Sequence, residues 1–226
     1  MPRNGTDDVW LVVPLYNEAA VIADVIEHVL PVFPNVVCVD DGSTDDSAAL
    51  AESAGAVVVR HPINLGQGAA LQTGFDFARQ DPGMRCVVTF DSDGQHRVED
   101  ALAAVERLRA GDVDVVLGSR FLDDRTNAGW LKRVVLRMAI AFTNVTTGMR
   151  LTDAHNGLRA LTRESLGQVQ IRQNRMAHAS EIVSLIAKAK LRVAEIPVQI
   201  IYTEYSRSKG QSLWNSVNIL IDLVLK

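Results

Sequence analysis

Two aspartates stand two positions apart directly after an apolar run: Asp91 and Asp93 follow V-V-T-F at Val87–Phe90. Side chains at i and i+2 of a strand point to the same side, so the spacing predicts two carboxylates together at a strand end. Carboxylates that close repel each other unless a cation lies between them. Oxygen ligands suit Mg²⁺ or Mn²⁺, which keep open positions for substrate phosphates, and Gln95 offers a third oxygen. The pattern predicts a divalent metal site, although an ordinary strand-to-turn transition uses the same residue types.

Polar residues also follow two other apolar runs, in positions suited to a nucleotide. V-V-P-L-Y-N-E ends at Asn17 and Glu18, which offer donors and acceptors for a nucleobase. V-D-D-G-S-T-D contains Asp40 and Asp41, whose carboxylates can accept hydrogen bonds from ribose hydroxyls or a base N–H. Each segment alone is equally typical of a strand–turn–helix junction with a capping residue. Together with the aspartate pair they favour a nucleotide site.

The elements that must position these residues alternate through the first 119 residues. We expect strands at Val9–Pro14, Val36–Asp40, Ala56–Arg60, Cys86–Asp91 and Val113–Gly118. We expect helices at Glu18–Leu30, Asp45–Ala54 (with Ser43 or Thr44 as N-cap), Gly68–Arg79 and Val98–Ala110. This alternation predicts an α/β fold with a mostly parallel sheet covered on both faces, and such sheets bind ligands at the carboxyl ends of their strands.

The second half is less regular. We expect a helix over residues 128–147, a loop then a strand over Asp153–Thr162, a helix at Met176–Ala189 and a strand at Leu191–Tyr202. A polar loop, Thr203–Ser212, and an apolar helix with a narrow polar stripe, Leu213–Lys226, follow. That helix would be about 21 Å long, too short to span a bilayer, so it would lie in the membrane interface, dock on a partner, form a dimer contact or join the core.

Composition is that of an ordinary globular protein, with 47% hydrophobic and 22% charged residues. The polar first eight residues give no sign of a secretory signal, and no apolar run approaches the ~18 residues of a membrane span. Cys38 and Cys86 fall in predicted strands that would lie roughly 9–10 Å apart on either side of a central one. We therefore expect two reduced thiols.

Charge is divided unevenly along the chain. Residues 1–119 carry 7 Lys and Arg against 19 Asp and Glu, whereas residues 120–226 carry 16 against 8. We interpret the first half as cation-binding and the second as meeting phosphates, an anionic membrane surface or both, although uneven surface decoration gives the same counts. The basic half lacks interleaved aromatic residues, so no nucleic-acid binding is expected.

Five motifs, in this order and spacing, resemble family 2 glycosyltransferases of the GT-A fold: V-P-L-Y-N-E, D-D-G-S-T-D, N-L-G-Q-G-A-A-L-Q-T-G, D-S-D-G-Q and G-S-R. D-A-H-N-G-L-R-A and Y-S-R-S-K-G-Q-S are similar to a bacterial subgroup of the enzymes that glycosylate polyprenyl phosphates, the dolichol-phosphate mannosyltransferase type. The resemblance implies one GT-A domain over residues 1–226. Its parts would be a Rossmann-like nucleotide-sugar and metal half (1–119), an acceptor half (120–212) and a C-terminal amphipathic helix (213–226).

The resemblance also implies roles for individual residues. The nucleotide-sugar would be bound by Pro14, Tyr16, Asn17, Glu18, Asp40, Asp41, Gly68, Asp91 and Ser92, with the loop 64–68 along its edge. The metal, Mg²⁺ or Mn²⁺, would be held by Asp91, Asp93 and Gln95. Arg120 would face the acceptor phosphate. Apart from the resemblance, an anionic acceptor needs cations, and the sequence supplies Arg120, Arg133, Arg207 and Lys209; we expect the catalytic set to be Asp93, Arg120, Asp153, Arg207 and Lys209.

Acceptor chemistry separates the alternatives. A sugar hydroxyl normally needs a general base, for which Asp153 is the best candidate, unless its carboxylate only orients Arg120 or Arg159. A lipid phosphate is already anionic at neutral pH and needs cations instead, which this sequence supplies. We therefore expect an inverting hexosyltransferase that moves a sugar from a nucleotide-sugar, UDP-linked in preference to GDP-linked, to a polyprenyl phosphate.

The enzyme would work on the cytoplasmic face of the membrane as a peripheral protein, beside a small membrane protein or as a homodimer. The alternatives are a transferase with a hydroxyl acceptor in cell-surface glycan synthesis, a metal-dependent nucleotidyltransferase and a non-catalytic nucleotide-binding protein. A nucleotidyltransferase usually has a glycine-rich basic loop after its first strand, and the acidic Y-N-E stands there instead.

Overall fold

A computed structural model of the chain describes residues 5–123, 130–175 and 177–201, with 130–136 described as helix backbone only. Its strands are β1 (Val9–Leu15), β2 (Asn35–Asp40), β3 (Val57–Arg60), β4 (Cys86–Thr89), β5 (Val115–Ser119), β6 (Arg159–Thr162) and β7 (Val193–Pro197). Its helices are α1 (Ile22–Val29), α2 (Ser47–Ser53), α3 (Gln67–Ala78), α4 (Val98–Arg109), α5 (Trp130–Thr147), α6 (Arg163–Leu166) and α7 (His178–Lys188).

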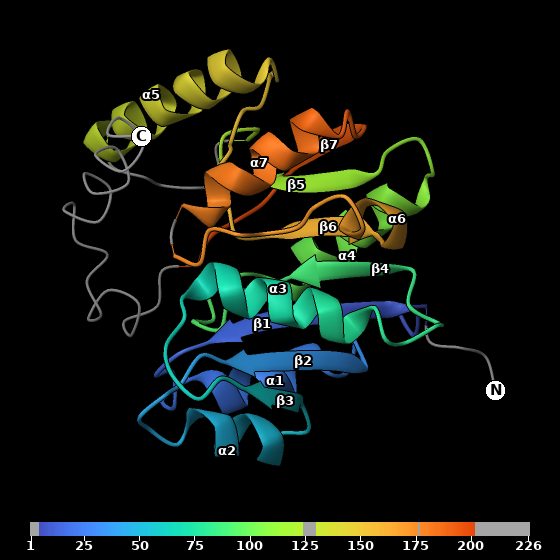
Figure 1. The fold of residues 1–226 in the computed structure, drawn as a ribbon, viewed down its shortest axis with the longest axis vertical. Helices are drawn as coiled ribbons and strands as arrows, with labels where there is room; N and C mark the ends of the chain where they lie inside the picture. Colours follow the sequence, from blue (N-terminus) through green and yellow to red (C-terminus); the bar gives the residue numbers. More distant parts are fainter. Residues whose placement is uncertain (1–4, 124–129, 176, 202–226) are drawn as a thin grey trace.

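The described strands form one seven-stranded sheet in the order β3-β2-β1-β4-β6-β5-β7. Figure 1 shows this order from β3 at the bottom of the sheet to β7 at the top. β6 runs antiparallel to both of its neighbours, and the other pairings are parallel. The predicted α/β architecture with a mostly parallel sheet is confirmed. Because β6 is reversed, its first residue, Arg159, lies at the edge where β4 and β5 have their carboxyl ends.

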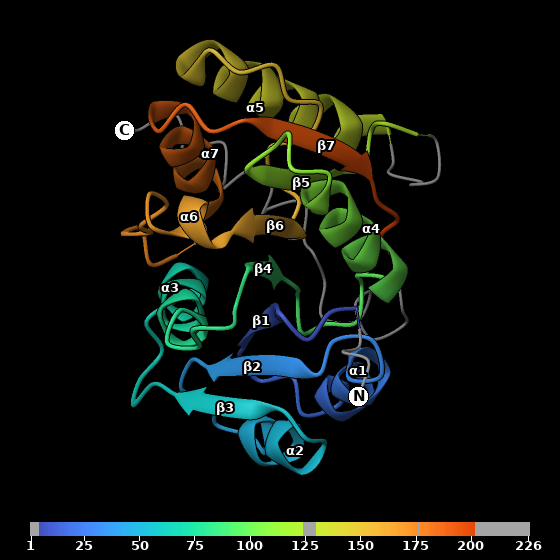
Figure 2. The same cartoon turned by 90° about the vertical axis from the view of Figure 1, so that its right-hand side faces the viewer.

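Helices cover both faces of the sheet, as Figure 2 shows, with α1 and α4 on one side and α3, α6 and α7 on the other. Two apolar clusters result, and neighbouring residues of β1 contribute to opposite ones: Leu11 and Val13 to the first, Val12 to the second. Strands buried on both faces need a nearly continuous apolar sequence, which explains the composition of β1, β2 and β4.

The first helix begins later than predicted, at Ile22 rather than Glu18. The amides of Glu18 and Ala19 donate to the Ser47 hydroxyl and to the Asp45 carboxylate, so the chain after β1 is tied to the β2–α2 loop before it coils. The capping prediction for α2 was wrong. Asp46 occupies the N-cap position and makes no side-chain cap hydrogen bond.

Smaller differences lie in the second half. The four-residue helix α6 was not predicted, and β7 ends at Pro197 instead of continuing to residue 202. Cys38 and Cys86 are free and buried on strands flanking β1, as expected. Within the described ranges no helix is both long and apolar enough to cross a membrane. The predicted loop Thr203–Ser212 and helix Leu213–Lys226 lie outside the described residues.

Candidate active site

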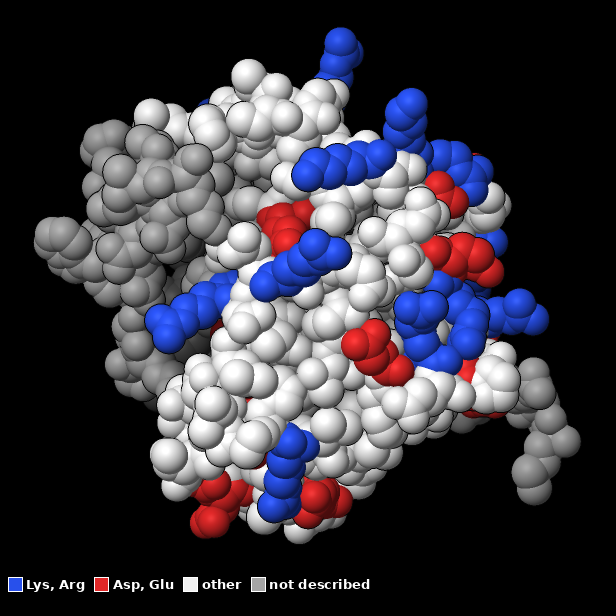
Figure 3. Space-filling view, in the orientation of Figure 1, with Lys and Arg blue, Asp and Glu red and all other residues white. Residues whose placement is uncertain are grey.

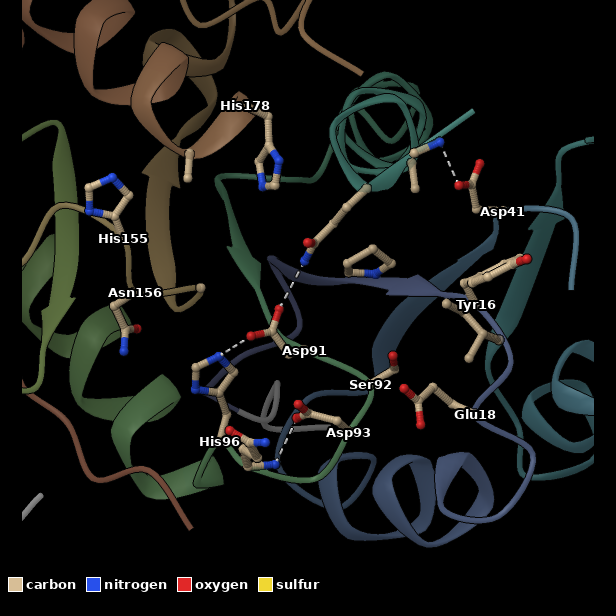
Figure 4. Close-up of a pocket in the computed structure, with 18 of the residues that line it drawn as sticks. Tyr16, Glu18, Asp41, Asp91, Ser92, Asp93, His96, His155, Asn156 and His178 are labelled. Atoms are coloured by element: carbon tan, nitrogen blue, oxygen red, sulfur yellow. Dashed lines mark hydrogen bonds and ion pairs between the residues drawn. The ribbon is translucent and has the colours of Figure 1, made fainter. Parts of the chain in front are cut away.

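A pocket of about 700 Å³ opens at the carboxyl ends of β1, β2, β4 and β5, within the usual size range of small-ligand sites. Figure 4 shows carboxylates around it, and the loop before β6 forms its far wall. The lining includes nine of the residues implicated above: Pro14, Tyr16, Glu18, Asp41, Asp91, Ser92, Asp93, Gln95 and Arg120. The sequence prediction that polar strand ends converge on one edge is therefore confirmed.

Asp91 follows β4 and is fixed from two sides. His96 Nε2 lies 2.9 Å from Asp91 Oδ2, and Gln67 Nε2 donates to Asp91 Oδ1 over 3.3 Å. Burial raises the pKa of Asp91, but the charge and hydrogen bond of His96 and the charge of Arg159 outweigh it, so its pKa lies below the usual range. Asp91 is therefore ionised and held in one orientation.

No side chain could fit between Asp91 and the loop before β6. A Cβ added to Gly157 would lie 2.3 Å from Asp91 Oδ2, far inside van der Waals contact. Glycine at this position lets the backbone approach the carboxylate, and it fixes one wall of the pocket.

Asp93 has a different environment. Its Oδ1 accepts a hydrogen bond from the amide of Gln95 over 3.0 Å. Burial and the neighbouring charge of Asp91 nevertheless raise the pKa of Asp93 to about 6. The pair therefore repels, as two carboxylates without a cation between them do.

These residues fit a divalent cation. The described residues hold no cluster of three His, Cys, Asp or Glu side chains able to bind a metal. Asp91, Asp93 and the Gln95 side chain would therefore supply an incomplete set of oxygen ligands. Mg²⁺ and Mn²⁺ accept such a set, because they complete their coordination with substrate phosphates and water.

Asp41, at the end of β2, anchors the loop that precedes α3. It accepts hydrogen bonds from the amides of Leu65 and Gly66, and His61 Nδ1 lies 2.8 Å from its Oδ1. His61 Nε2 in turn lies 2.9 Å from Thr73 Oγ1 on α3. The carboxylate thus fixes the loop that forms the α3 edge of the pocket while also lining the pocket itself.

Three residues expected at the donor do not line the pocket: Asn17, Asp40 and Gly68. Asn17 Oδ1 accepts from the amide of Thr44, and Asp40 Oδ1 from the amide of Ser43, so both brace the β1 and β2 loops. Gly68 packs against the chain before α7, where an added Cβ would lie 2.0 Å from the carbonyl oxygen of Gln173.

Arg120 lines the pocket and is held by a two-pronged ion pair. Its Nε and Nη2 donate to Asp153 Oδ2 and Oδ1 over 2.6 and 2.9 Å, and the Asp153 side chain is fully buried. Burial raises the pKa of Asp153, yet the charge and hydrogen bonds of Arg120 lower it below its usual value. Asp153 does not line the pocket, and this geometry fits a carboxylate that orients Arg120 rather than a base.

The other acceptor-side predictions fall outside the description. Arg133 lies in the backbone-only part of α5, and Arg207 and Lys209 lie beyond residue 201. On the face in Figure 3, Lys and Arg side chains are interspersed with Asp and Glu rather than gathered in one patch.

Comparison with known proteins agrees with this geometry. The sequence model described as Glycosyl transferase family 2 matches residues 10–169. The chain belongs to glycosyltransferase family 2.

Named relatives of this family 2 glycosyltransferase include lipid-phosphate enzymes. UDP-N-acetylglucosamine–dolichyl-phosphate N-acetylglucosaminyltransferase of Methanococcus voltae is 28% identical, over 96% of this chain and 95% of its own. Undecaprenyl-phosphate 4-deoxy-4-formamido-L-arabinose transferase of Sodalis glossinidius is 31% identical, over 96% of this chain and 67% of its own.

A solved structure shares the fold. Glucosyl-3-phosphoglycerate synthase from Mycobacterium tuberculosis, in complex with Mn²⁺ and UDP-glucose, superposes with a TM-score of 0.71 at 22% identity. The match covers 96% of this chain and 78% of that one. The chain thus has the GT-A-like fold of a glycosyltransferase.

Several pocket residues of this family 2 glycosyltransferase were missed by the sequence reasoning: His96, Asn156, Gly157 and Arg175 as lining residues, and His61 behind Asp41. His96 directly follows D-S-D-G-Q, and that adjacency was a usable signal. His155 and His178 also line the pocket. Burial lowers the pKa of each to about 4, so both are neutral near pH 7.

Proposed function

We propose that the protein transfers a sugar from a nucleotide-sugar, UDP-linked in preference to GDP-linked, to a polyprenyl phosphate, with inversion at the anomeric carbon. The observation that carries the proposal is the pairing of Arg120 with Asp153. A guanidinium that lines the same pocket as Asp91 and Asp93 is fixed by an ion pair, and the carboxylate that fixes it, the candidate base, is buried and does not line the pocket.

On the donor side, Tyr16, Glu18 and Asp41 would contact the nucleoside. Asp91, Asp93 and Gln95 would bind the diphosphate through Mg²⁺ or Mn²⁺. The bound metal would neutralise the charge that grows on the leaving diphosphate. The protein's part is to fix the carboxylates before the donor arrives, which His96 and Gln67 do for Asp91. The Methanococcus voltae relative, which is named for a UDP-sugar and a dolichyl phosphate, supports the proposed donor and acceptor classes.

On the acceptor side, a phosphate monoester needs orientation and charge neutralisation rather than proton removal. Its second pKa is about 6, so an oxygen is already nucleophilic at neutral pH. Arg120, held by Asp153, supplies a rigid fork for such an oxygen, and Arg133, Arg207 and Lys209 would add further cations.

A lipid acceptor also calls for contact with a membrane, and the proposal includes peripheral attachment to the cytoplasmic face. Met138, Phe142 and Val145 lie on one face of α5 and are 61%, 45% and 84% exposed. Spacing of four and three residues makes them a continuous apolar stripe. Arg137 and Arg150, both exposed, add positive charge nearby.

The test is transfer from radiolabelled UDP- and GDP-sugars to short polyprenyl phosphates, with Mn²⁺ or with a chelator. We expect alkali-stable glycolipid from one donor, lost with the chelator and in Asp93→Ala. Asp112→Ala, which removes an exposed carboxylate paired with Arg107, is the matched control and should keep activity. Donor hydrolysis without lipid labelling, even with membranes added, would refute the lipid acceptor in favour of a hydroxyl acceptor.

A further inference from the structure

Arg159 is a buried cation that faces the pocket. It is the first residue of β6, it is only 3% exposed, and it lines the pocket wall. Burial lowers its pKa to about 10, so the guanidinium remains charged at neutral pH. A charge taken out of water costs stability unless a partner compensates it.

The two carboxylates whose charges act on Arg159 are occupied by other donors. Asp91 is bonded by His96 and Gln67, and Asp153 by Arg120. Among the described residues, no carboxylate oxygen lies within the 4.0 Å of an ion pair from the Arg159 guanidinium. Its five N–H donors therefore have the capacity to bind an anion entering the pocket.

The topology puts this guanidinium between the two halves of the site. Arg159 pairs in register with Thr89 of β4 and with Leu117 of β5. Asp91 follows the first of these strands and Arg120 the second. A planar guanidinium in this place matches the geometry of two phosphoryl oxygens.

We propose that Arg159 binds a phosphoryl oxyanion of a substrate in this pocket. The inference rests on the proposed function, which brings two such groups to the site: the donor diphosphate and the acceptor phosphate. The chemistry of recognition is the same for both, and binding experiments with separate probes distinguish them.

The experiment is calorimetric titration of the full chain with inorganic pyrophosphate plus Mg²⁺, and separately with farnesyl phosphate. Arg159→Met and Arg159→Gln remove the charge at similar length, and Arg192→Gln, which removes an exposed arginine paired with Asp114, is the matched control. We expect the neutral variants to bind at least one probe about tenfold more weakly or worse, since they lose charge-assisted hydrogen bonds to the phosphoryl oxygens. Arg159→Lys should recover part of the loss.

The probe whose affinity is lost identifies which substrate phosphate Arg159 binds. A loss confined to pyrophosphate assigns Arg159 to the donor, and a loss confined to farnesyl phosphate assigns it to the acceptor. Wild-type affinity for both probes in a cooperatively unfolding neutral variant overturns the proposal. If neither neutral variant folds, Arg159→Lys decides: affinity at least threefold weaker for a probe supports the proposal, and unchanged affinity overturns it.

Failure of the proposed function is separable from failure of this inference. Weakened probe binding in the variants, with no sugar transfer to any polyprenyl phosphate by the wild type, would leave Arg159 as an anion site and remove the lipid acceptor. Normal sugar transfer by a neutral Arg159 variant would leave the proposed function standing and would remove Arg159 as a site for a substrate phosphate.

Discussion

At the scale of single residues, the negative charge of Asp93 destabilises the folded protein, because the carboxylate is buried beside Asp91. Its pKa of about 6 lies above the ordinary 3.8 because the carboxylate is desolvated and faces Asp91. The folded state therefore binds a proton that the unfolded chain releases between about pH 4 and 6. Stability of the metal-free protein falls as pH rises through that window, and the full penalty is present above pH 6.

Replacement of Asp93 by Asn should stabilise the metal-free protein while abolishing transfer. At pH 7.5 with a chelator we expect a gain of roughly 1 kcal/mol in the free energy of unfolding, shrinking toward zero near pH 4. Urea unfolding at both pH values measures it. Asp112→Asn is the control, because the Arg107 hydrogen bond lowers the pKa of Asp112 and its loss gives no gain at pH 7.5. A destabilised Asp93→Asn at pH 7.5 would contradict this account of the pair.

Asp153→Asn should destabilise the protein as well as slow transfer. It removes the charge that compensates Arg120 in a buried pair, which costs about 2–4 kcal/mol. The ion pair is lost whichever role Asp153 has, but a base for a hydroxyl acceptor replaced by its amide would abolish transfer and leave donor hydrolysis largely intact. Thermal unfolding and donor hydrolysis, measured on the same preparation, separate the two roles.

At the scale of elements, the pocket depends on close approaches between helices and the sheet. Gly74 of α3 lies against β1, where an added Cβ would be 2.3 Å from Val12 Cγ1. Gly68 brings the start of the same helix against residues 173–174. These two glycine contacts therefore determine how closely α3 packs against β1 and against the chain before α7. They position the helix beside the pocket residues Pro14 and Asp41.

Gly74→Ala should destabilise the fold by about 2 kcal/mol, because a methyl group would have to displace Val12 or the helix. Gly5→Ala, where nothing lies within 4 Å of the added Cβ, is the matched control and should change little. Urea unfolding compares them. Equal midpoints for the two variants would show that the α3–β1 contact adjusts without cost.

The sequence predicts those parts of the site that local patterns determine. Strand ends with Asp91, Asp93 and Asp41 follow from apolar runs that stop at turn residues, and the structure brings these carboxylates to one pocket. The late start of α1 was not predictable in this way, because the Ser47 hydroxyl that binds the Glu18 amide comes from the next strand–helix connection.

Arg159 illustrates the same limit. Its closeness to Asp91 arises from the reversed insertion of β6 between β4 and β5, a pairing between segments far apart in sequence. Hydrophobic periodicity identifies a strand there but not its neighbours. The sequence offers Asp153 either as a base or as a carboxylate that orients an arginine, and the contact with Arg120, which favours the second reading, comes from a segment 33 residues away.

At the scale of the whole molecule, the exposed apolar stripe lies at one end. α5 lies beside β7 and α7, at the opposite end of the sheet from β3 and α2 (Figure 1, Figure 2). The pocket opens between these ends at the strand termini. This arrangement is compatible with a protein that meets a lipid surface at one end.

Replacing Met138, Phe142 and Val145 together by Ser should weaken binding to vesicles of anionic phospholipid about tenfold, because most of the exposed apolar area of the stripe is lost. The control replaces Val57 and Ile63, exposed by 43% and 64%, by Ser. Vesicle flotation compares them. Equal loss in both variants, or none in the stripe variant, would contradict membrane contact through α5.

The reversed strand β6 also has a consequence for the order in which the protein is assembled on the ribosome. Strands β1 to β4 are the first four in the chain and form one continuous block of the sheet, in the order β3-β2-β1-β4, so they can pair with one another once β4 has emerged. β5 is synthesised next but has no neighbour until β6 and β7 follow, and β4 keeps an open edge meanwhile. The nascent chain should therefore pair β1 to β4 first, while β5 stays unpaired until β6 inserts between β4 and β5.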